Sequence, residues 1–185
     1  MTRWRRLTRP GDAAAVERLV AATGFFSDEE RRVAVELVEE RLAKGEASGY
    51  EFVFADAAAG GSLLGYACYG PIPATQSSCD LYWIAVSPAE QGKGLGRELA
   101  DEAERLAREQ GMTRMYADTS GREQYASTRA FYESLGYSKA AVLEDFYAPG
   151  DAKVIYSKAL LRPTVPADAG QRRGRHPLRG ILWRK

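Results

Sequence analysis

The stretch VSPAEQGKGLGREL, residues 86–99, constrains the fold of this chain more than any other segment. It follows an apolar run, is interrupted by Pro88, passes three alternating glycines and continues with helical periodicity. Each glycine at a helix start gives up about 1 kcal/mol of helix propensity relative to alanine, so three of them indicate something lying against the backbone. A helix N-terminus presents unpaired N–H groups and a partial positive charge. We therefore interpret the loop as a cradle for a pyrophosphate.

The composition is that of a single globular domain, with 185 residues, 45% of them hydrophobic and 28% charged. No apolar run approaches the roughly 20 residues that span a bilayer, and no apolar segment follows the basic N-terminus. We therefore predict a cytoplasmic protein without a membrane partner.

Cysteine and histidine usage excludes several kinds of site. Cys68 and Cys79 lie in apolar, strand-like contexts without CxxC spacing, which favours buried, reduced thiols. The single histidine, His176, lies in a Pro/Arg/Gly-rich segment. This nearly excludes a histidine-dependent triad or a histidine-rich metal site, since neither can form without imidazoles. We expect no metal.

Charge is divided unevenly along the chain. Seven of the 26 basic residues but one of the 25 acidic residues lie in 162–185, which leaves 19 against 24 in residues 1–161, a net charge of about −5. An acidic body suits a cationic small molecule better than a polyanion, so nucleic acid is not the expected partner. The basic segment 162–185 is predicted to be a flexible tail; a tether to nucleic acid or the ribosome is the alternative.

Apolar periodicity and turn residues predict alternating helices and strands. Capping boxes are predicted at Ser27 with Glu30 and at Ser120 with Glu123. Strand, glycine loop, helix and strand in succession predict a right-handed crossover between parallel strands. The predicted order is a strand (4–8), helices between residues 10 and 24 and between 27 and 45, three strands (50–55, 63–69, 80–86), a helix ending at residue 111, a strand (112–118), a helix ending at residue 136, and two strands (142–147, 153–160).

Two common phosphate-binding patterns do not fit the loop. The third glycine of G-x-G-x-x-G falls on Arg97, and no Gly-Lys-Ser/Thr follows. A glycine-rich turn without a ligand remains the alternative to the cradle.

Two other motifs give the chain a resemblance to the GNAT superfamily of acetyl-CoA-dependent N-acetyltransferases, over about residues 3–161. Gln91, Gly94 and Gly96 match the family pattern Gln/Arg-x-x-Gly-x-Gly/Ala between an apolar strand and a helix. Residues 131–137, FYESLGY, match a later pattern of an aromatic pair, three spacers, glycine and an aromatic residue.

The resemblance implies a mixed α/β (α+β) fold. Its central sheet would have about seven mostly antiparallel strands, with about four flanking helices and one splayed pair of parallel strands. The domain would cover residues 1–161 and be followed by the tail, 162–185.

The resemblance also implies that acetyl-CoA lies where the strand of residues 81–86 separates from that of residues 115–119. At the position of Tyr125 the family often has an asparagine that bonds to the pantetheine. This contact is therefore in doubt here, and Thr119, Ser120 or Arg129 could supply a substitute polar contact. The implied cofactor-binding residues are Ile84, Ala85, Val86, Gln91, Gly92, Lys93, Gly94, Leu95, Gly96, Arg97, Thr119 and Tyr125.

Tyr132 falls on the family's general-acid tyrosine, which protonates the leaving thiolate, although it could also be a packing residue. For the general base we nominate Asp80, because partial burial at the head of an apolar strand would raise its pKa; a surface role is the alternative, and Glu46 is the second choice. Aromatic residues nominated for the acceptor pocket are Phe25, Phe26, Tyr50, Tyr69, Tyr82, Phe146 and Tyr147.

The predicted function is transfer of an acetyl group from acetyl-CoA to a primary amine, on a small molecule or a protein, by direct attack in a ternary complex. Two alternatives stay open: a CoA-binding sensor without acetyl transfer, and a protein-modifying enzyme tethered by its tail. The chain would be a monomer or a homodimer.

Overall fold

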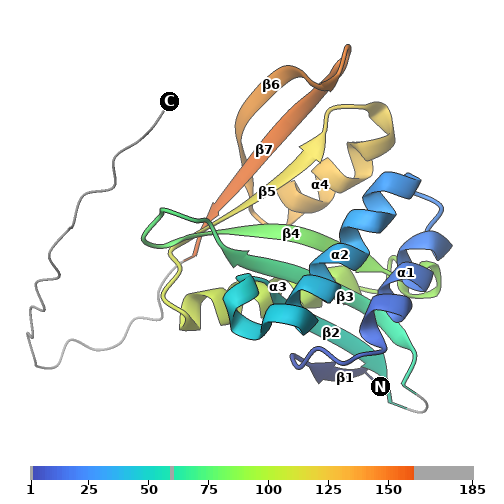
Figure 1. Cartoon of the computed structure of the whole chain (residues 1–185). Coiled ribbons are helices and arrows are strands. Elements are labelled where there is room, and N and C mark those ends of the chain that lie inside the picture. The colour runs from blue at the N-terminus through green and yellow to red at the C-terminus, as the bar shows by residue number, and fades with distance from the viewer. Residues whose placement is uncertain (1, 59–60, 161–185) are drawn as a thin grey trace, which may run out of the picture.

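A computed structural model describes residues 2–58 and 61–160, which form a seven-stranded sheet in the order β1-β2-β3-β4-β5-β7-β6 (Figure 1). The predicted tail lies outside the described residues. The elements are β1 (Thr2–Arg5), α1 (Asp12–Ala22), α2 (Asp28–Lys44), the 3-10 helix η1 (Gly45–Ser48), β2 (Glu51–Ala57), β3 (Leu63–Pro71), β4 (Ser78–Val86), η2 (Pro88–Glu90), α3 (Leu95–Glu109), β5 (Arg114–Ser120), η3 (Glu123–Tyr125), α4 (Ala126–Ser134), β6 (Ser138–Ala148) and β7 (Asp151–Ala159).

One pair of neighbouring strands is parallel and the others are antiparallel, as predicted. The parallel pair, β4 and β5, is bonded only from Ser78–Arg114 to Asp80–Tyr116. Beyond Asp80, β4 continues along β3 as far as Val86, whereas β5 continues along β7. The two parallel strands therefore separate within the sheet, which confirms the splayed pair.

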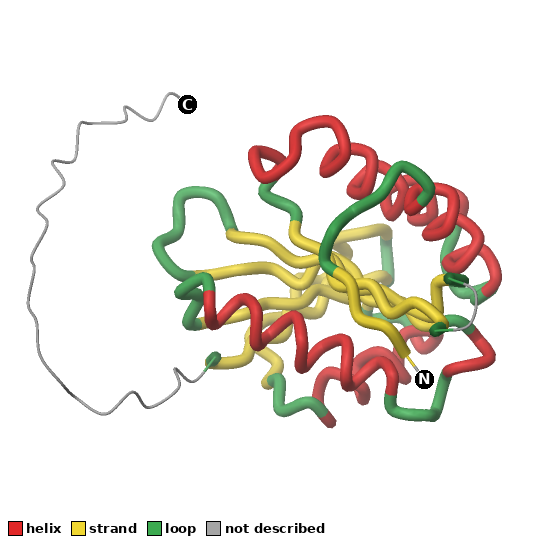
Figure 2. Tube along the Cα trace, turned by 90° about the horizontal axis from the view of Figure 1, so that it is seen from below, coloured by secondary structure: helices red, strands yellow, loops and turns green. Residues whose placement is uncertain are grey.

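Helices cover both faces of the sheet (Figure 2). Buried residues of α1 and α2 pack with one face of β2 and β3, around Phe52, Phe54 and Tyr66. Buried residues of α3 and α4 pack on the opposite face, around Leu99 and Met115. The strands β2 and β3 are thus buried on both faces. None of the described helices is long and apolar enough to cross a membrane.

One predicted capping box forms and the other does not. The Ser27 hydroxyl accepts from Glu30 N (3.2 Å), and the Glu30 carboxylate accepts from Ser27 N (2.8 Å). The box predicted at Ser120 and Glu123 is wrong. Ser120 is still paired within β5, and its hydroxyl donates to Asp151 of the neighbouring strand. That hydroxyl accepts from the backbone N–H of Arg122 (3.1 Å) and not from that of Glu123, and Arg122 is the N-cap residue of η3.

The two cysteines are buried and free, as predicted. Burial, and secondarily the negative charge of Asp80, raises the pKa of Cys79 to about 12. The pKa of Cys68 is also raised by burial. Both thiols therefore stay protonated at neutral pH, and neither is a ready nucleophile.

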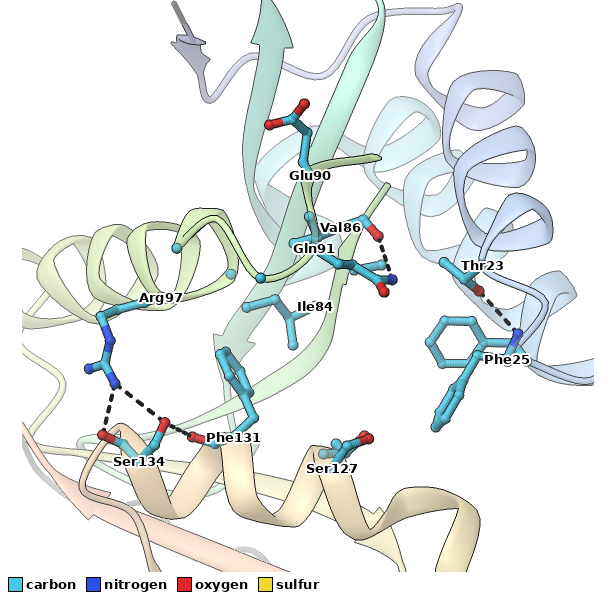
Figure 3. A pocket seen from close by; sticks show the side chains of 16 residues that line it. Thr23, Phe25, Ile84, Val86, Glu90, Gln91, Arg97, Ser127, Phe131 and Ser134 are labelled. Atoms are coloured by element: carbon cyan, nitrogen blue, oxygen red, sulfur yellow. Dashed lines mark hydrogen bonds between the residues drawn. The ribbon is translucent and has the colours of Figure 1, made fainter. Parts of the chain in front are cut away.

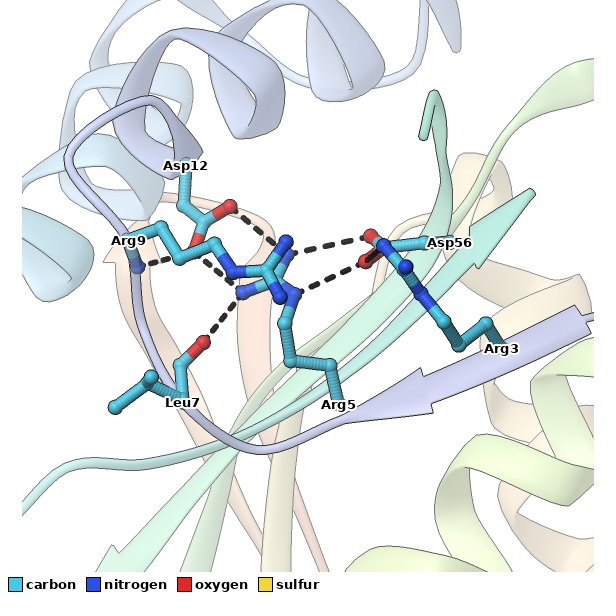
Figure 4. A network of polar contacts seen from close by, with 6 residues as sticks. All are labelled: Arg3, Arg5, Leu7, Arg9, Asp12 and Asp56. Carbon is cyan, nitrogen blue, oxygen red and sulfur yellow. Dashed lines mark hydrogen bonds and ion pairs between the residues drawn. The ribbon is translucent and has the colours of Figure 1, made fainter. Parts of the chain in front are cut away.

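A buried arginine ties the start of α1 to the edge of the sheet (Figure 4). The Arg5 guanidinium bonds Asp12 of α1 (2.7 Å) and Asp56 of β2 (3.0 Å), and it lies 4.2 Å from the centre of the Phe54 ring. Asp12 also accepts from the backbone N–H of Arg9 (2.6 Å). Burial alone would raise the pKa of Asp56, but the hydrogen bonds from Arg5 outweigh it and lower that pKa.

We predict that Arg5→Met lowers the free energy of unfolding by about 3–5 kcal/mol, because it leaves two buried carboxylates without their cation. Arg3→Met is the matched control: Arg3 lies 3.5 Å from the same Asp56, but its side chain is 58% exposed, against 8% for Arg5. The control should cost at most about 1 kcal/mol. Urea denaturation compares the two variants, and equal losses would contradict the assignment.

Candidate active site

A cleft of about 580 Å³ lies beside the end of β4, between the α1–α2 loop and the helices α3 and α4 (Figure 3). Phe25 of the α1–α2 loop, residues 23–27, lies on one side of it, and Phe131 and Ser127 of α4 lie on another. The lining residues are Thr23, Phe25, Phe26, Ile84, Ala85, Val86, Glu90, Gln91, Gly92, Gly94, Gly96, Arg97, Ser127, Thr128, Phe131 and Ser134.

Two of the three loop glycines are required by their backbone conformation. Gly92 and Gly94 have φ of +73° and +93°, a left-handed conformation that other residues adopt only with strain. Gly96 has ordinary φ, and a Cβ there would lie in van der Waals contact with the Phe131 ring, 3.4 Å away. The conformation of the chain therefore accounts for Gly92 and Gly94, and the cradle for a ligand stays a prediction.

The loop leaves the start of α3 uncapped. Gly94 occupies the N-cap position and has no side chain to offer, and the first helical hydrogen bond runs from Glu98 N to Gly94 O (3.1 Å). Among the described residues, the N–H groups of Leu95, Gly96 and Arg97 have no hydrogen-bond partner. These groups and the helix dipole give this wall of the cleft a positive potential.

The two cations predicted for the cofactor are both engaged with protein groups. Lys93 pairs with Glu90 (3.3 Å) and does not line the cleft. The guanidinium of Arg97 donates to the Ser134 carbonyl (3.0 Å), at the C-terminal end of α4. Arg97 thus joins α3 to α4 across the cleft wall.

The end of β4 offers one free edge to the cleft. Ile84, Ala85 and Val86 pair with β3 on one side, whereas pairing with β5 has ended at Asp80. Gln91 Nε2 donates to the Val86 carbonyl (3.4 Å), which fixes the loop to the strand (Figure 3). Peptide groups on the free edge are available to a ligand.

Several predicted contacts lie behind the cleft rather than in its lining. Thr119 is buried near the end of β5, and its hydroxyl has no hydrogen-bond partner among the described residues. Tyr125 packs on the Phe25 ring, with ring centres 4.8 Å apart, and its hydroxyl donates to Glu30 (2.6 Å). The Arg129 guanidinium donates a hydrogen bond to the carbonyl of Ser120 (2.9 Å).

Tyr132 of α4 is 5% exposed and packs against three aromatic rings, each 5.7 Å away: Phe131, Tyr137 and Tyr156. Burial, and secondarily the negative charge of Asp118, raises the pKa of Tyr132 above its usual value. Its phenol therefore remains protonated at any working pH.

Asp80 lies where β4 and β5 part. Burial, and secondarily the negative charge of Asp118, raises its pKa to about 6, although Lys153 acts in the opposite direction. Lys153 forms an ion pair with Asp118. The negative charge of Asp118 raises the pKa of both Asp80 and Tyr132, and neither of these two residues is among those that line the cleft.

The remaining nominated residues are scattered. Phe25 and Phe26 line the cleft, whereas Tyr69 is buried in the core against α3, and Glu46 is exposed in η1. The rings of Tyr50 and Tyr82 pack together on the α1–α2 face, with centres 5.2 Å apart. Phe146 and Tyr147 are half exposed on β6.

Sequence reasoning missed part of the lining. The missed side chains are Thr23, Glu90, Ser127, Thr128, Phe131 and Ser134. A signal existed for three of them: Ser127, Phe131 and Ser134 are spaced i, i+4, i+7 and so share one face of α4.

Comparison with known proteins identifies the class and the family. The family model described as Acetyltransferase (GNAT) family matches residues 14–137, about two thirds of the chain. Together with the fold, this match defines the protein as an acyltransferase. More particularly, the chain belongs to the GNAT family of acetyltransferases.

Two curated relatives match different shares of this chain. The N-acetyltransferase YjgM of Escherichia coli, itself uncharacterized, is 30% identical over 137 residues, which are 72% of this chain and 80% of YjgM. Mycothiol acetyltransferase of Beutenbergia cavernae is 36% identical over 70 residues, which are 38% of this chain and 23% of that protein.

Solved structures agree with the fold. A GNAT-family protein of Desulfovibrio desulfuricans has a TM-score of 0.84 and 49% identity, over 87% of this chain and 100% of that one. The yncA protein of Salmonella typhimurium, solved with acetyl-CoA, has a TM-score of 0.65 and 21% identity, over 91% of this chain and 99% of that one.

We predict that the Asp80 carboxyl titrates near pH 6, as its raised pKa requires, so that it is mostly protonated below that pH and mostly ionised above it. Asp118→Asn should lower this pKa because it removes a neighbouring negative charge. Carbon-13 NMR titration of the aspartate carboxyls measures both values. Asp101→Asn, at an exposed site on α3, is the control that should leave Asp80 unchanged. A normal Asp80 pKa near 4 would contradict the account.

Proposed function

We propose that this protein transfers an acetyl group from acetyl-CoA to a primary amine by direct attack in a ternary complex. One observation carries the proposal: the uncapped start of α3 and the free edge of β4 border a single cleft, beside the point just past Asp80 where β4 separates from β5. The acetyl-CoA in the similarly folded yncA structure supports the choice of donor.

The donor would be held mainly by backbone groups. The N–H groups of residues 92–97 would bind the pyrophosphate, since a helix N-terminus with a preceding left-handed loop suits an anion, and Lys93 and Arg97 would add positive charge. The free edge of β4 at Ile84, Ala85 and Val86 would bond the pantetheine and the thioester carbonyl. Thr119 has a buried hydroxyl still lacking a partner, which suits it to a further polar contact. A backbone N–H of this edge would stabilise the oxyanion.

The chemistry requires a base and an acid near the thioester. In the proposed step, the ammonium form of the acceptor loses one proton to Asp80, and the neutral amine attacks the acetyl carbon. The carbon–sulfur bond breaks as Tyr132 protonates the departing thiolate. The nitrogen releases its second proton to solvent, from which Tyr132 recovers its own, and Asp80 returns its proton to solvent. The raised pKa of Asp80, about 6, suits a base at neutral pH, and the raised pKa of Tyr132 suits an acid.

The acceptor is proposed to be a small cationic amine. Phe25 and Phe26 supply apolar walls to the cleft, and the acidic body of residues 1–161 attracts positive charge. A protein amine is the alternative acceptor, which the same assay can detect.

The test is release of free thiol when acetyl-CoA is mixed with a panel of primary amines and peptides. We expect amine-dependent release by the natural protein, and a turnover number reduced at least about fivefold in Tyr132→Phe, with acetyl-CoA affinity changed less than about twofold. Tyr137→Phe is the matched control, because it removes a phenol from the neighbouring ring, 5.7 Å away.

Unchanged turnover in Tyr132→Phe would remove Tyr132 from the mechanism. If acetyl-CoA binds but no amine produces thiol, the transferase proposal is wrong and a CoA-binding sensor is favoured.

A further inference from the structure

The α1–α2 loop is bonded to the connection between β5 and α4, about a hundred residues further along the chain. Gln124 Nε2 donates to the Phe25 carbonyl (2.9 Å), and the Tyr125 hydroxyl donates to Glu30 in the first turn of α2 (2.6 Å). One hydrogen bond therefore links the loop, and a second links the start of α2 that follows it, to the segment that leads into α4.

The two phenylalanines of the loop are each held by an aromatic partner from another element. Phe25 meets Tyr125 edge-on, with ring centres 4.8 Å apart. Phe26 meets Trp83 of β4, with ring centres 5.0 Å apart. Both phenylalanines line the cleft, so the position of this wall depends on Tyr125 and Trp83.

Glu30 is shared between the helix cap and Tyr125. One carboxylate oxygen accepts from Ser27 N and the other accepts from the Tyr125 hydroxyl. Burial would raise the pKa of Glu30, but the hydrogen bonds from Tyr125 and Ser27 outweigh it and lower that pKa. Glu30 therefore stays ionised at neutral pH, and its hydrogen bond with Tyr125 is charge-assisted.

The Tyr125 ring also has a cationic neighbour that is itself held in place. The Arg122 guanidinium lies 5.5 Å from the ring centre and pairs with Asp151 of β7 (2.9 Å). Tyr125 is thus fixed between the sheet and the loop.

We propose that Tyr125 is a positioning residue: through Glu30 and Phe25 it holds the α1–α2 loop against the cleft, so that Phe25 and Phe26 form a fixed wall of the acceptor site. This role differs from the pantetheine contact expected at this position from the sequence. The inference has two halves. The structural half, that Tyr125 holds the loop in place, does not depend on the proposed function. The kinetic half, that this position affects the binding of the acceptor amine, rests on it.

The structural half is tested by hydrogen exchange of residues 23–27 in the full-length protein. Tyr125→Phe should exchange faster there than the natural protein. Tyr156→Phe is the matched control: it removes a Tyr–Glu bond of similar length, 2.8 Å to Glu133, that does not involve the loop. Unchanged exchange in Tyr125→Phe would overturn the proposal. Gln124→Ala removes the hydrogen bond to the Phe25 carbonyl and should accelerate hydrogen exchange of the same residues. This variant replaces Tyr125→Phe in the test if Tyr125→Phe is unstable.

A double-mutant cycle with Glu30→Ala isolates the hydrogen bond. Glu30→Ala also removes the helix cap and loosens the loop by itself. In that background Tyr125→Phe should add little, because its partner is already absent. Full additivity of the two substitutions would show that Tyr125 does not act through Glu30 and would overturn the proposal.

The kinetic half is tested with acetyl-CoA and the amine of the panel that has the highest kcat/KM. Tyr125→Phe should raise the KM for the amine about fivefold, the factor expected from the loss of one hydrogen bond, with kcat within about twofold. Tyr156→Phe should change neither. An unchanged KM in Tyr125→Phe would overturn the acceptor role while leaving the transferase intact. An inactive natural protein would instead overturn the proposed function and with it the acceptor role, and the exchange result would still decide whether Tyr125 holds the loop.

Discussion

The structure depends on one break in backbone pairing, the separation of β4 from β5 beyond Asp80. In a sheet, the backbone N–H and C=O groups on both edges of an inner strand are normally hydrogen-bonded to neighbouring strands. The peptide groups on a free edge therefore need another hydrogen-bond partner. Here the free edge of β4 leads directly into a loop whose left-handed Gly92 and Gly94 leave the start of α3 uncapped. Two sets of polar backbone groups, from one strand and one helix, therefore border a single cleft.

The separation begins just past Asp80, and the negative charge of Asp118 raises the pKa of both Asp80 and Tyr132 of α4. In the proposed function, a donor held on the side of α3 and α4 would be reached by an amine from the side of α1 and α2. The loop between α1 and α2, held by Tyr125 and Glu30, completes the wall that such an amine would meet.

Prediction from sequence succeeded where the signal was local. Ser27 and Glu30 lie three residues apart and form the predicted cap, and the glycine loop lies in the predicted order between strand and helix. It failed where a residue distant in the sequence is involved. The Ser120 hydroxyl donates a hydrogen bond to Asp151, which is adjacent to it only in the folded sheet. Likewise, no local pattern shows that Thr23 and Ser127 line one cleft, because their elements meet only through tertiary packing.

The most direct test of this account compares acetyl-CoA binding by Gly94→Ala and Gly111→Ala. The two glycines lie at opposite ends of α3 with φ of +93° and +87°, and a Cβ at either would meet no protein atom within 4 Å, so the two substitutions introduce similar strain. Only Gly94 borders the cleft. Calorimetry should show affinity for acetyl-CoA reduced at least about tenfold in Gly94→Ala, because the added methyl group would occupy space at the proposed pyrophosphate site and weaken its charge-assisted hydrogen bonds, and little changed in Gly111→Ala. Undiminished binding by Gly94→Ala would contradict the assignment of the α3 N-terminus as the donor site.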